Sequence, residues 1–170
     1  VIVFSNSLKS DFAWDDKYLI VSNPYVKDFS YLPKVFTSQL YDGSGMESNF
    51  YRPLQLFSFA IDYSIWKLNP FGYHLTSLLL HIFNSALVYY IVFIICSSFP
   101  MAFLAALMFG VSPAISGAAY YISARADLLM AFFVFLSILF FIKYRETRKK
   151  APYVISIISF ILSMLCKEMA

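Results

Sequence analysis

Two adjacent carboxylates near the start of the chain are the residues best suited to acid–base chemistry. Asp15 and Asp16 follow the aromatic Trp14, just after a short apolar stretch. Because two like charges beside low-dielectric lipid resist simultaneous ionisation, we expect the pKa of one carboxylate to be raised. Such a carboxylate suits a general base that takes a proton from an acceptor hydroxyl. The alternative is a solvated pair that only caps a helix, since perturbed pairs mark functional sites only part of the time.

A second candidate position is Arg52, which directly precedes Pro53. Proline favours the first turn of a helix, so we predict an amphipathic helix over about 53–68. One face of this helix carries Leu54, Phe57, Ile61, Ile65 and Leu68, with Gln55, Ser58 and Asp62 beside it. A helix of this type can lie in the membrane interface, and its N-terminus with Arg52 would bind phosphate. The alternative is that Arg52 only extends to lipid headgroups.

Two more charged clusters stand at the ends of apolar segments. Arg125 and Asp127 come at the start of one segment, and Lys167 and Glu168 follow the end of another. A single charge at such a place usually marks only the membrane boundary. These residues become site candidates if the fold brings them to the same face as the carboxylate pair.

The histidines and cysteines do not predict a metal site. His74 and His81 are seven residues apart, so they share nearly the same face of one helix. A polar stripe of this kind usually packs against neighbouring membrane helices, and too few further ligands are visible for zinc. Cys96 and Cys166 fall in or beside apolar segments, where a disulfide framework is not expected. The residues indicate no metal or other cofactor, although a divalent cation stays open.

The composition sets the class of protein that must position these side chains. Of the 170 residues, 60% are hydrophobic and 14% are charged, whereas soluble domains average about 45–50% and about 25%. The net charge of +3 is too small for binding to a nucleic-acid backbone, so no nucleic-acid partner is expected. Disordered chains and disulfide-rich secreted modules are excluded as well. The composition predicts an all-α polytopic membrane protein with the lipid bilayer as its partner.

The chain divides into a short apolar start, a polar loop and a membrane region. Residues 1–8 are too few for a span and are read as the end of a truncated transmembrane helix, with the chain a piece of a longer protein. Residues 9–71 contain most of the acids and several turn signals, which indicates a large water-facing loop. The predicted transmembrane helices cover about 72–96, 100–122, 127–144 and 152–166. Pro113 is expected to kink the second of these.

Loop charge predicts the orientation of the helices. The segment 143–150 holds five bases and one acid, and short loops this basic stay on the cytoplasmic side. Counting spans from this segment also places Ser97 and Ser98 on the cytoplasmic side. The loop 9–71, the pair Arg125 and Asp127, and the pair Lys167 and Glu168 then fall on the outer or lumenal face. The four charged clusters are therefore predicted to converge on one face of the membrane.

An ordered series of short motifs carries a resemblance to a known family. The motifs are FAWDDKYLIVSNP at 12–24, YRPL at 51–54, LNPFGYHL at 68–75, LLLH at 78–81, RADLL at 125–129 and KE at 167–168. In this order they resemble the membrane part of the TPR-containing transmembrane O-mannosyltransferase-like family, within the GT-C glycosyltransferases. The resemblance implies a GT-C-like transmembrane helix bundle with a large outer first loop that carries interfacial helices. TPR repeats usually follow such a membrane region.

The resemblance also implies a reaction and a set of residue roles. Enzymes of this kind transfer a sugar from a polyprenyl-phosphate carrier to an acceptor hydroxyl of a protein or glycan, on the outer or lumenal face of a bacterial inner membrane or an endoplasmic reticulum membrane. Protein O-mannosylation is one such reaction. The roles are catalysis for Asp15 and Asp16, donor-phosphate binding for Arg52, Arg125 and Lys167, and support for Asp127, Glu168, His74 and His81. No cofactor is implied beyond the polyprenyl-phosphate-linked sugar, which is the donor substrate.

Two alternative functions remain open at this point. Similar proteins often carry His before Pro113 and Glu at position 117, where this chain has Ser112 and Gly117. This difference motivates a non-catalytic membrane scaffold for a TPR interaction module. A transporter or flippase is the third hypothesis, but transporters place ionisable groups near the bilayer midplane, whereas most charges here stand at span ends.

Overall fold

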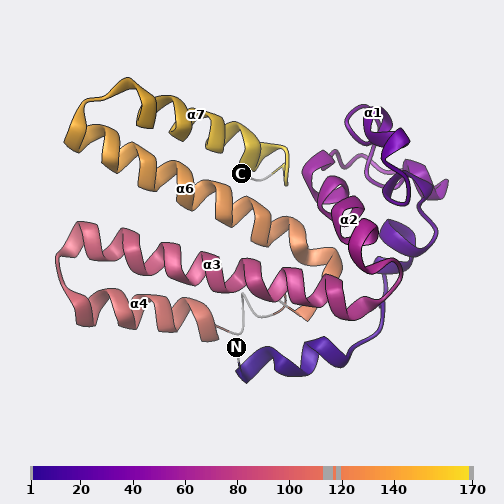
Figure 1. Ribbon diagram of the computed structural model, residues 1–170, viewed down its shortest axis with the longest axis horizontal. Helices are drawn as coiled ribbons and strands as arrows, with labels where there is room; N and C mark the ends of the chain where they lie inside the picture. Colours follow the sequence, from indigo (N-terminus) through magenta and orange to yellow (C-terminus); the bar gives the residue numbers. More distant parts are fainter. Residues whose placement is uncertain (1, 113–116, 118–119, 169–170) are drawn as a thin grey trace.

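A computed structural model describes residues 2–112, 117 and 120–168 of the chain. Every regular element in these residues is helical (Figure 1). The longer helices are α2 (Pro53–Trp66), α3 (Pro70–Cys96), α4 (Phe99–Val111), α6 (Arg125–Thr147) and α7 (Lys150–Met164). The shorter elements are η1 (Ile2–Lys9), η2 (Lys17–Val21), η3 (Pro24–Val26), η4 (Phe29–Tyr31), α1 (Leu32–Val35), η5 (Asp42–Ser44) and η6 (Ile122–Ala124).

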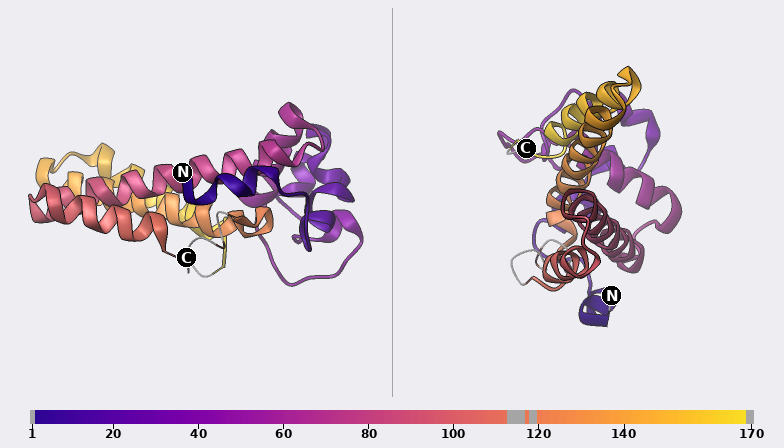
Figure 2. Two further views of the ribbon diagram at one scale, coloured as in Figure 1. Left: turned by 90° about the horizontal axis from the view of Figure 1, so that it is seen from below. Right: turned by 90° about the vertical axis from the view of Figure 1, so that its left-hand side faces the viewer.

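The long helices form an elongated bundle with a folded unit at one end (Figures 1 and 2). Helices α3 and α6 run in the same direction, and each is followed by an antiparallel neighbour, α4 or α7. The unit made of residues 9–66 lies at the end where α3 and α6 begin, which we call the loop end. The α3–α4 and α6–α7 connections lie at the opposite end, which we call the turn end. The predicted grouping of 9–71, Arg125 and Lys167 away from segment 143–150 therefore matches the two ends of the molecule.

Capping residues explain where α3 begins and why the chain reverses at the turn end. The Asn69 side chain accepts a hydrogen bond from the backbone amide of Phe71 at 3.2 Å, and Pro70 occupies the first turn of α3. At the other end Ser97 adopts a left-handed backbone with φ 50°, and Arg148 does so after α6 with φ 54°. Left-handed residues terminate helices because they redirect the chain while satisfying a last carbonyl.

Two helices are long and apolar enough to cross a membrane. They are Pro70–Cys96 and the continuous stretch Ile122–Thr147, with 27 and 26 residues. Helix α4 has 13 residues and α7 has 15, which gives about 20 Å and about 22 Å against a hydrocarbon core of about 30 Å. Two of the four predicted transmembrane helices are therefore long enough to cross a membrane. The predicted span 100–122 is not one helix, because α4 ends at Val111 and Tyr121 is non-helical. The predicted kink at Pro113 lies outside the described residues.

Helix α7 has an apolar outer surface and buries mainly serines. In α7 the buried residues are Pro152, Ser156, Ser159 and Ser163, whereas isoleucines and other large apolar side chains are exposed on its surface. The Ser156 hydroxyl donates to the carbonyl of Ser137 in α6 at 2.9 Å. A helix in water shows the reverse pattern, but membrane helices associate through small and hydrogen-bonding residues. This arrangement agrees with an apolar environment around α7.

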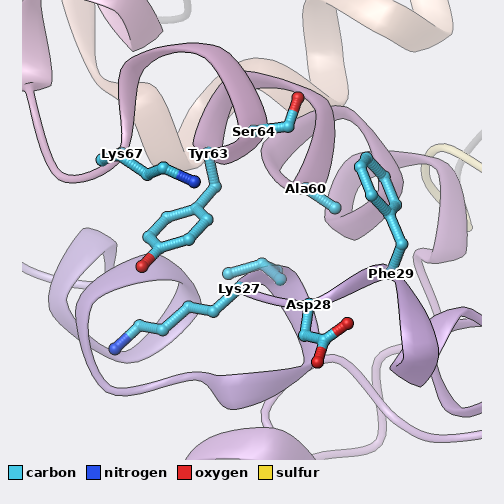
Figure 3. Close-up of a pocket in the computed structure, with 8 residues that line it drawn as sticks. Lys27, Asp28, Phe29, Ala60, Tyr63, Ser64 and Lys67 are labelled. Atoms are coloured by element: carbon cyan, nitrogen blue, oxygen red, sulfur yellow. The ribbon is translucent and has the colours of Figure 1, made fainter.

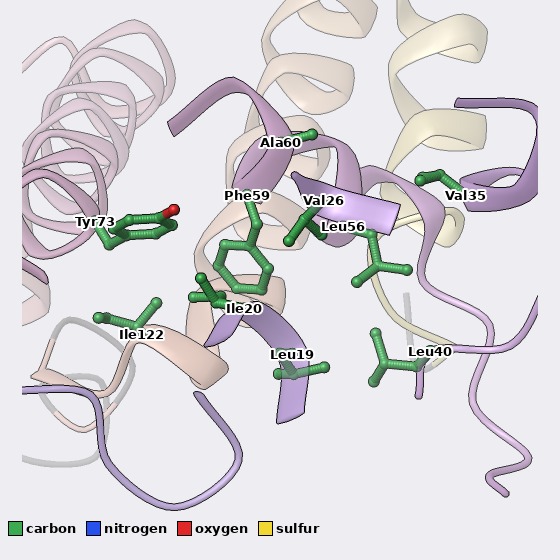
Figure 4. Close-up of a cluster of buried hydrophobic side chains, with 10 residues drawn as sticks. All are labelled: Leu19, Ile20, Val26, Val35, Leu40, Leu56, Phe59, Ala60, Tyr73 and Ile122. Atoms are coloured by element: carbon green, nitrogen blue, oxygen red, sulfur yellow. The ribbon is translucent and has the colours of Figure 1, made fainter. Parts of the chain in front are cut away.

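The unit at the loop end has a hydrophobic core of its own (Figure 4). Its buried members are Leu19, Ile20, Val26, Val35, Leu40, Leu56, Phe59, Ala60, Tyr73 and Ile122. Two of them come from the bundle, since Tyr73 lies in α3 and Ile122 in η6. The polar loop predicted over 9–71 is therefore a packed unit that is joined to the start of both long helices.

Glycine is required where α2 turns into α3. A Cβ placed on Gly72 would lie 2.1 Å from Cγ of Trp66, and both other nearest atoms belong to the same indole ring. Because the clash involves the base of the ring, the whole side chain must move. We expect Gly72→Ala to destabilise the protein by roughly 1–3 kcal/mol, more than the gain of about 1 kcal/mol in helix propensity can offset. The melting midpoint of the full-length protein in detergent measures this effect.

Gly110→Ala is the matched control for this prediction. Gly110 lies in α4, and a Cβ there would meet the Ser85 hydroxyl at 3.4 Å, an ordinary contact distance. We expect its midpoint to stay near that of the wild type. An equal midpoint for both variants would contradict the close approach of Trp66 to α3.

Candidate functional site

Asp16 is buried and ties the start of the chain to the start of α6. Its Oδ2 accepts a hydrogen bond from the backbone amide of Ala13 at 3.0 Å, and its Oδ1 accepts one from the amide of Ser123 at 2.8 Å. Burial raises the pKa of Asp16 although both hydrogen bonds act against it, and the neighbouring Asp15 adds a smaller effect. The predicted direction of the shift is therefore confirmed, but desolvation rather than like-charge repulsion is its main cause.

The backbone of Ser123 joins three segments at this point. Its amide donates to Asp16, and its carbonyl accepts a hydrogen bond from Nε2 of the buried Gln55 at 2.7 Å. Gln55 belongs to α2, so the backbone amide and carbonyl of Ser123 link the carboxylate segment, α2 and the N-terminus of α6. A buried polar contact of this type fixes relative positions because leaving either group unpaired is costly.

Asp15 differs from Asp16 in that it is exposed to solvent. Next to it, Trp14 exposes 81% of its side chain and has a left-handed backbone with φ 49°. Left-handed geometry in a residue other than glycine costs on the order of 1–3 kcal/mol, and such residues cluster at functional sites. The hydrogen bond from Ala13 to Asp16 closes the turn that holds Trp14 in this geometry. The two adjacent acids thus have different environments, one anchored and one accessible.

Tyr41 is a member of this cluster that the sequence motifs do not reveal. Burial, the charge of Asp15 and a hydrogen bond with Asp15 raise the pKa of Tyr41 to about 12, and the positive charge of Arg52 opposes the shift. Tyr41 therefore lies within electrostatic reach of both the accessible carboxylate and the nearest predicted phosphate ligand. It stands in an irregular segment before η5, where no local periodicity marks it.

Arg52 precedes α2 and pairs with the end of the chain. Its Nη2 lies 3.1 Å from Oε2 of Glu168, and the amide of Tyr51 donates to Oε1 of the same carboxylate. Burial alone would raise the pKa of Glu168, but the hydrogen bonds from Arg52 and Tyr51 lower it. The arginine side chain keeps 16% of its surface exposed, so it is partly accessible from solvent.

Lys167 and Asp127 form a second accessible pair beside the first. Nζ of Lys167 lies 2.5 Å from Oδ1 of Asp127, and their side chains are 22% and 40% exposed. The pair bridges the segment after α7 to the first turn of α6. The acidic residue also lies where an anion is favoured, since helix N-termini carry partial positive charge.

Arg125 has a different environment from the one predicted. Its side chain is 0% exposed and lies 2.6 Å, Nη1 to Oδ2, from Asp62 of α2. Nη2 donates to the carbonyl of Tyr73 at 2.7 Å, Nε donates to the Ser77 hydroxyl at 3.2 Å, and the ring of Phe59 lies 4.7 Å from the guanidinium carbon. Arg125 thus joins α2, α3 and α6 inside the protein, and its predicted role in binding donor phosphate stays a prediction.

The sequence motifs do not identify Asp62 as the partner of Arg125, although the pattern of the predicted amphipathic helix points to it. The predicted amphipathic helix places Gln55, Ser58 and Asp62 on one side, and these three side chains all contact the segment that begins α6. The apolar face of α2 points outward, with Ile61 and Ile65 exposed. The polar side of α2 therefore faces a buried arginine inside the protein, whereas the polar face of an ordinary amphipathic helix faces water.

The two histidines lie on the bundle side of this site. His74 is buried in the first turns of α3, near the loop end. Nε2 of His81, two turns further along, lies 3.0 Å from the carbonyl of Gly110 in α4, and its ring stacks on Phe109. His81 therefore contacts a neighbouring helix, as the polar stripe predicted. Among the described residues, no group of three His, Cys, Asp or Glu side chains is arranged to hold a metal ion.

A cavity of about 270 Å³ lies beside α2, separate from these residues (Figure 3). Tyr63, Ser64 and Lys67 line one side of it, and Lys27, Asp28 and Phe29 line the other. Nζ of Lys67 lies 5.2 Å from the centre of the Tyr63 ring. None of the predicted site residues lines this cavity, so the candidate site remains the cluster around Asp15, Arg52 and Lys167.

Comparisons with known proteins bear directly on the motifs of this cluster. The chain is 30% identical over 174 residues to protein O-mannosyl-transferase F38B6.6 of Caenorhabditis elegans, a match that covers 99% of the chain and 24% of that protein. It is 33% identical over 150 residues to human protein O-mannosyl-transferase TMTC2, covering 86% of the chain and 18% of the relative. With human protein O-mannosyl-transferase TMTC4 it shares 31% over 193 residues, covering 99% and 26%.

The chain thus spans about a quarter or less of the length of these curated relatives. No family model and no solved structure matches it. Two of these matches nevertheless cover 99% of the chain and the third covers 86%. The resemblance carried by the motifs is confirmed, and the chain is homologous to the TPR-containing transmembrane O-mannosyltransferase-like family.

Proposed function

We propose that this chain forms the site of a membrane glycosyltransferase of the GT-C type, which transfers a sugar from a polyprenyl-phosphate carrier to an acceptor hydroxyl. The carrying observation is the accessible carboxylate of Asp15 at the same end of the bundle as the two partly exposed cations Arg52 and Lys167. Tyr41 lies within the electrostatic reach of both Asp15 and Arg52. The names of the relatives, all protein O-mannosyl-transferases, favour a protein acceptor and mannose as the sugar.

In the proposed reaction, Asp15 is the general base and Asp16 positions it. The acceptor hydroxyl gives its proton to the Asp15 carboxylate while its oxygen attacks the anomeric carbon of the donor. A new glycosidic bond forms as the bond between the anomeric carbon and the phosphate oxygen breaks. The exposed ring of Trp14, next to the base, offers a flat apolar face against which a sugar ring can pack.

The leaving group explains why cations are needed on the other side of the site. Polyprenyl phosphate leaves with increased negative charge, and fixed cations stabilise that charge as it develops. Arg52 and Lys167 are suited to this task because both are partly exposed. Each has a carboxylate partner, Glu168 or Asp127, that holds the cation in place before the donor phosphate arrives.

We place the site on the outer or lumenal face, with α3 and α6 spanning the membrane. The five bases of segment 143–150 at the turn end support a cytoplasmic position for that end. The loop end, with the packed unit and the candidate site, then lies on the opposite side, where a lipid-linked donor and a protein acceptor can meet.

The proposed function is tested by comparing donors with the full-length protein in nanodiscs. We expect sugar transfer to a hydroxyl-bearing acceptor peptide from polyprenyl-phosphate mannose, and none from the nucleotide-linked sugar. Transfer from the nucleotide sugar alone would contradict the proposed donor. Absence of any transfer, with TPR-mediated binding of protein partners retained, would favour the scaffold.

A further inference from the structure

A second cavity lies between α3 and α6 at the turn end, far from the candidate site. Its volume is about 210 Å³. Tyr90 and Ile94 line it from α3, and Leu139, Phe140, Lys143, Glu146 and Thr147 line it from α6. Along α6 the lining changes from the apolar Leu139 and Phe140 to Lys143, Glu146 and Thr147 toward the helix end. The cavity therefore has an apolar part that suits an acyl chain and a charged opening that suits a lipid headgroup.

The mouth of this cavity belongs to a strongly basic segment. Residues 143–150 contain Lys143, Arg145, Arg148, Lys149 and Lys150 against the single acid Glu146. All six side chains are exposed. Every residue of this segment is described by the structure, and none of them takes part in the three ion pairs found among the described residues. One of these five bases, Lys143, lines the cavity together with Glu146. None of the five is in an ion pair with a carboxylate among the described residues.

Aromatic side chains lie at the same end of the bundle as the mouth of the cavity. Tyr144 and Tyr153 pack with ring centres 4.9 Å apart across the α6–α7 turn, and Tyr89 packs against Phe99 at 6.0 Å across the α3–α4 turn. Tyr90, at the cavity, exposes half of its side chain. Tyrosines are enriched where a membrane meets water, since the ring is apolar and the hydroxyl is hydrated. The cavity mouth therefore lies at the expected depth of lipid headgroups.

We propose that the cavity between α3 and α6 at the turn end binds the headgroup of an anionic phospholipid. Lys143 contacts the phosphate at the mouth, the other bases of segment 143–150 add positive charge at the same end of the bundle, and one acyl chain lies along Ile94, Leu139 and Phe140. Basic pockets between membrane helices favour such headgroups, and basic residues next to a membrane helix attract anionic lipids. The proposal depends on the membrane placement of α3 and α6 but not on the transferase activity.

The test uses the full-length protein purified from membranes and reconstituted in nanodiscs of defined lipid. Native mass spectrometry then measures how much phosphatidylserine or phosphatidylcholine each variant retains, since both share the same acyl chains. We expect phosphatidylserine to be retained in preference. Lys143→Gln should weaken its retention about fivefold, the effect of removing one base near a membrane surface. Lys17→Gln, which removes an exposed base at the loop end, is the matched control and should retain the lipid unchanged.

A second variant separates the cavity from the basic turn as a whole. Ile94→Trp fills the cavity without changing any charge, so it should abolish the selective retention while all five bases remain. If Ile94→Trp retains phosphatidylserine like the wild type, the lipid is held by the turn alone and the cavity site is wrong. Equal retention of phosphatidylcholine, or full displacement by millimolar inorganic phosphate, would likewise overturn the assignment. Transfer activity is measured in parallel, so a failure here is distinguished from a failure of the proposed function.

Discussion

Replacing Asp62 with Asn is expected to destabilise the protein by roughly 3–5 kcal/mol, the largest stability effect of any single change in the cluster. The change leaves Arg125 charged inside the protein, where its side chain is 0% exposed and its nearest counter-charge is the Asp62 carboxylate at 2.6 Å. A buried guanidinium without a carboxylate has no water to replace the lost interaction. The melting midpoint of the full-length protein in detergent measures the effect.

The Arg52–Glu168 pair provides the control, because it has the same chemistry at the surface. Its partners are 3.1 Å apart but 16% and 37% exposed, and exposed pairs contribute only about 0.2–1 kcal/mol. Glu168→Gln should therefore shift the midpoint far less than Asp62→Asn. The double variant Asp62→Leu with Arg125→Met should recover part of the loss, since apolar residues of similar volume often replace a buried pair at little cost. Equal shifts for Asp62→Asn and Glu168→Gln would contradict the burial of Arg125.

Local signals in the sequence explain the helices and the class of protein. Prolines at positions 53 and 70 occupy first turns of α2 and α3, as their fixed backbone angle favours. The long apolar run after Gly72 lies in a helix of span length, and so does the run after Asp127. Apolar composition did not predict the length of α4 and α7. It indicated a transmembrane span at each, but the helices have only 13 and 15 residues. Hydrophobicity reports the surroundings of a segment, not where its helix ends.

The partners within the site could be predicted only in part, because they depend on contacts between distant segments. Motifs identified Asp16 and Arg125, but not that Asp16 accepts from the amide of Ser123 or that Arg125 meets Asp62. A backbone amide carries no sequence signature, and Tyr41 lies in an irregular segment without periodicity. The polar side of α2 did contain the information on Asp62, yet a polar helix face is consistent with water as well as with a buried cation.

The difference between the two adjacent acids leads to the largest expected effect on activity. We expect Asp15→Asn to lower sugar transfer by roughly 10²–10⁴-fold, the usual contribution of a general base, while the melting midpoint stays unchanged because the side chain is exposed. Asp16→Asn should lower both quantities. Its carboxylate accepts hydrogen bonds from the amides of Ala13 and Ser123, and losing a charged acceptor in such a place costs roughly 1–3 kcal/mol.

Measuring transfer and melting midpoint on the same preparations separates the base from the residue that positions it. Asp11→Asn is the matched control, since Asp11 is an exposed acid four residues before Asp15 in the same segment, and it should leave both quantities as in the wild type. A positioning residue loses activity together with stability, whereas a base loses activity alone. If Asp15→Asn and Asp16→Asn both transfer sugar like the wild type, the carboxylate pair is not the catalytic site. If only Asp16→Asn loses activity and its midpoint is unchanged, the roles of the two acids are exchanged.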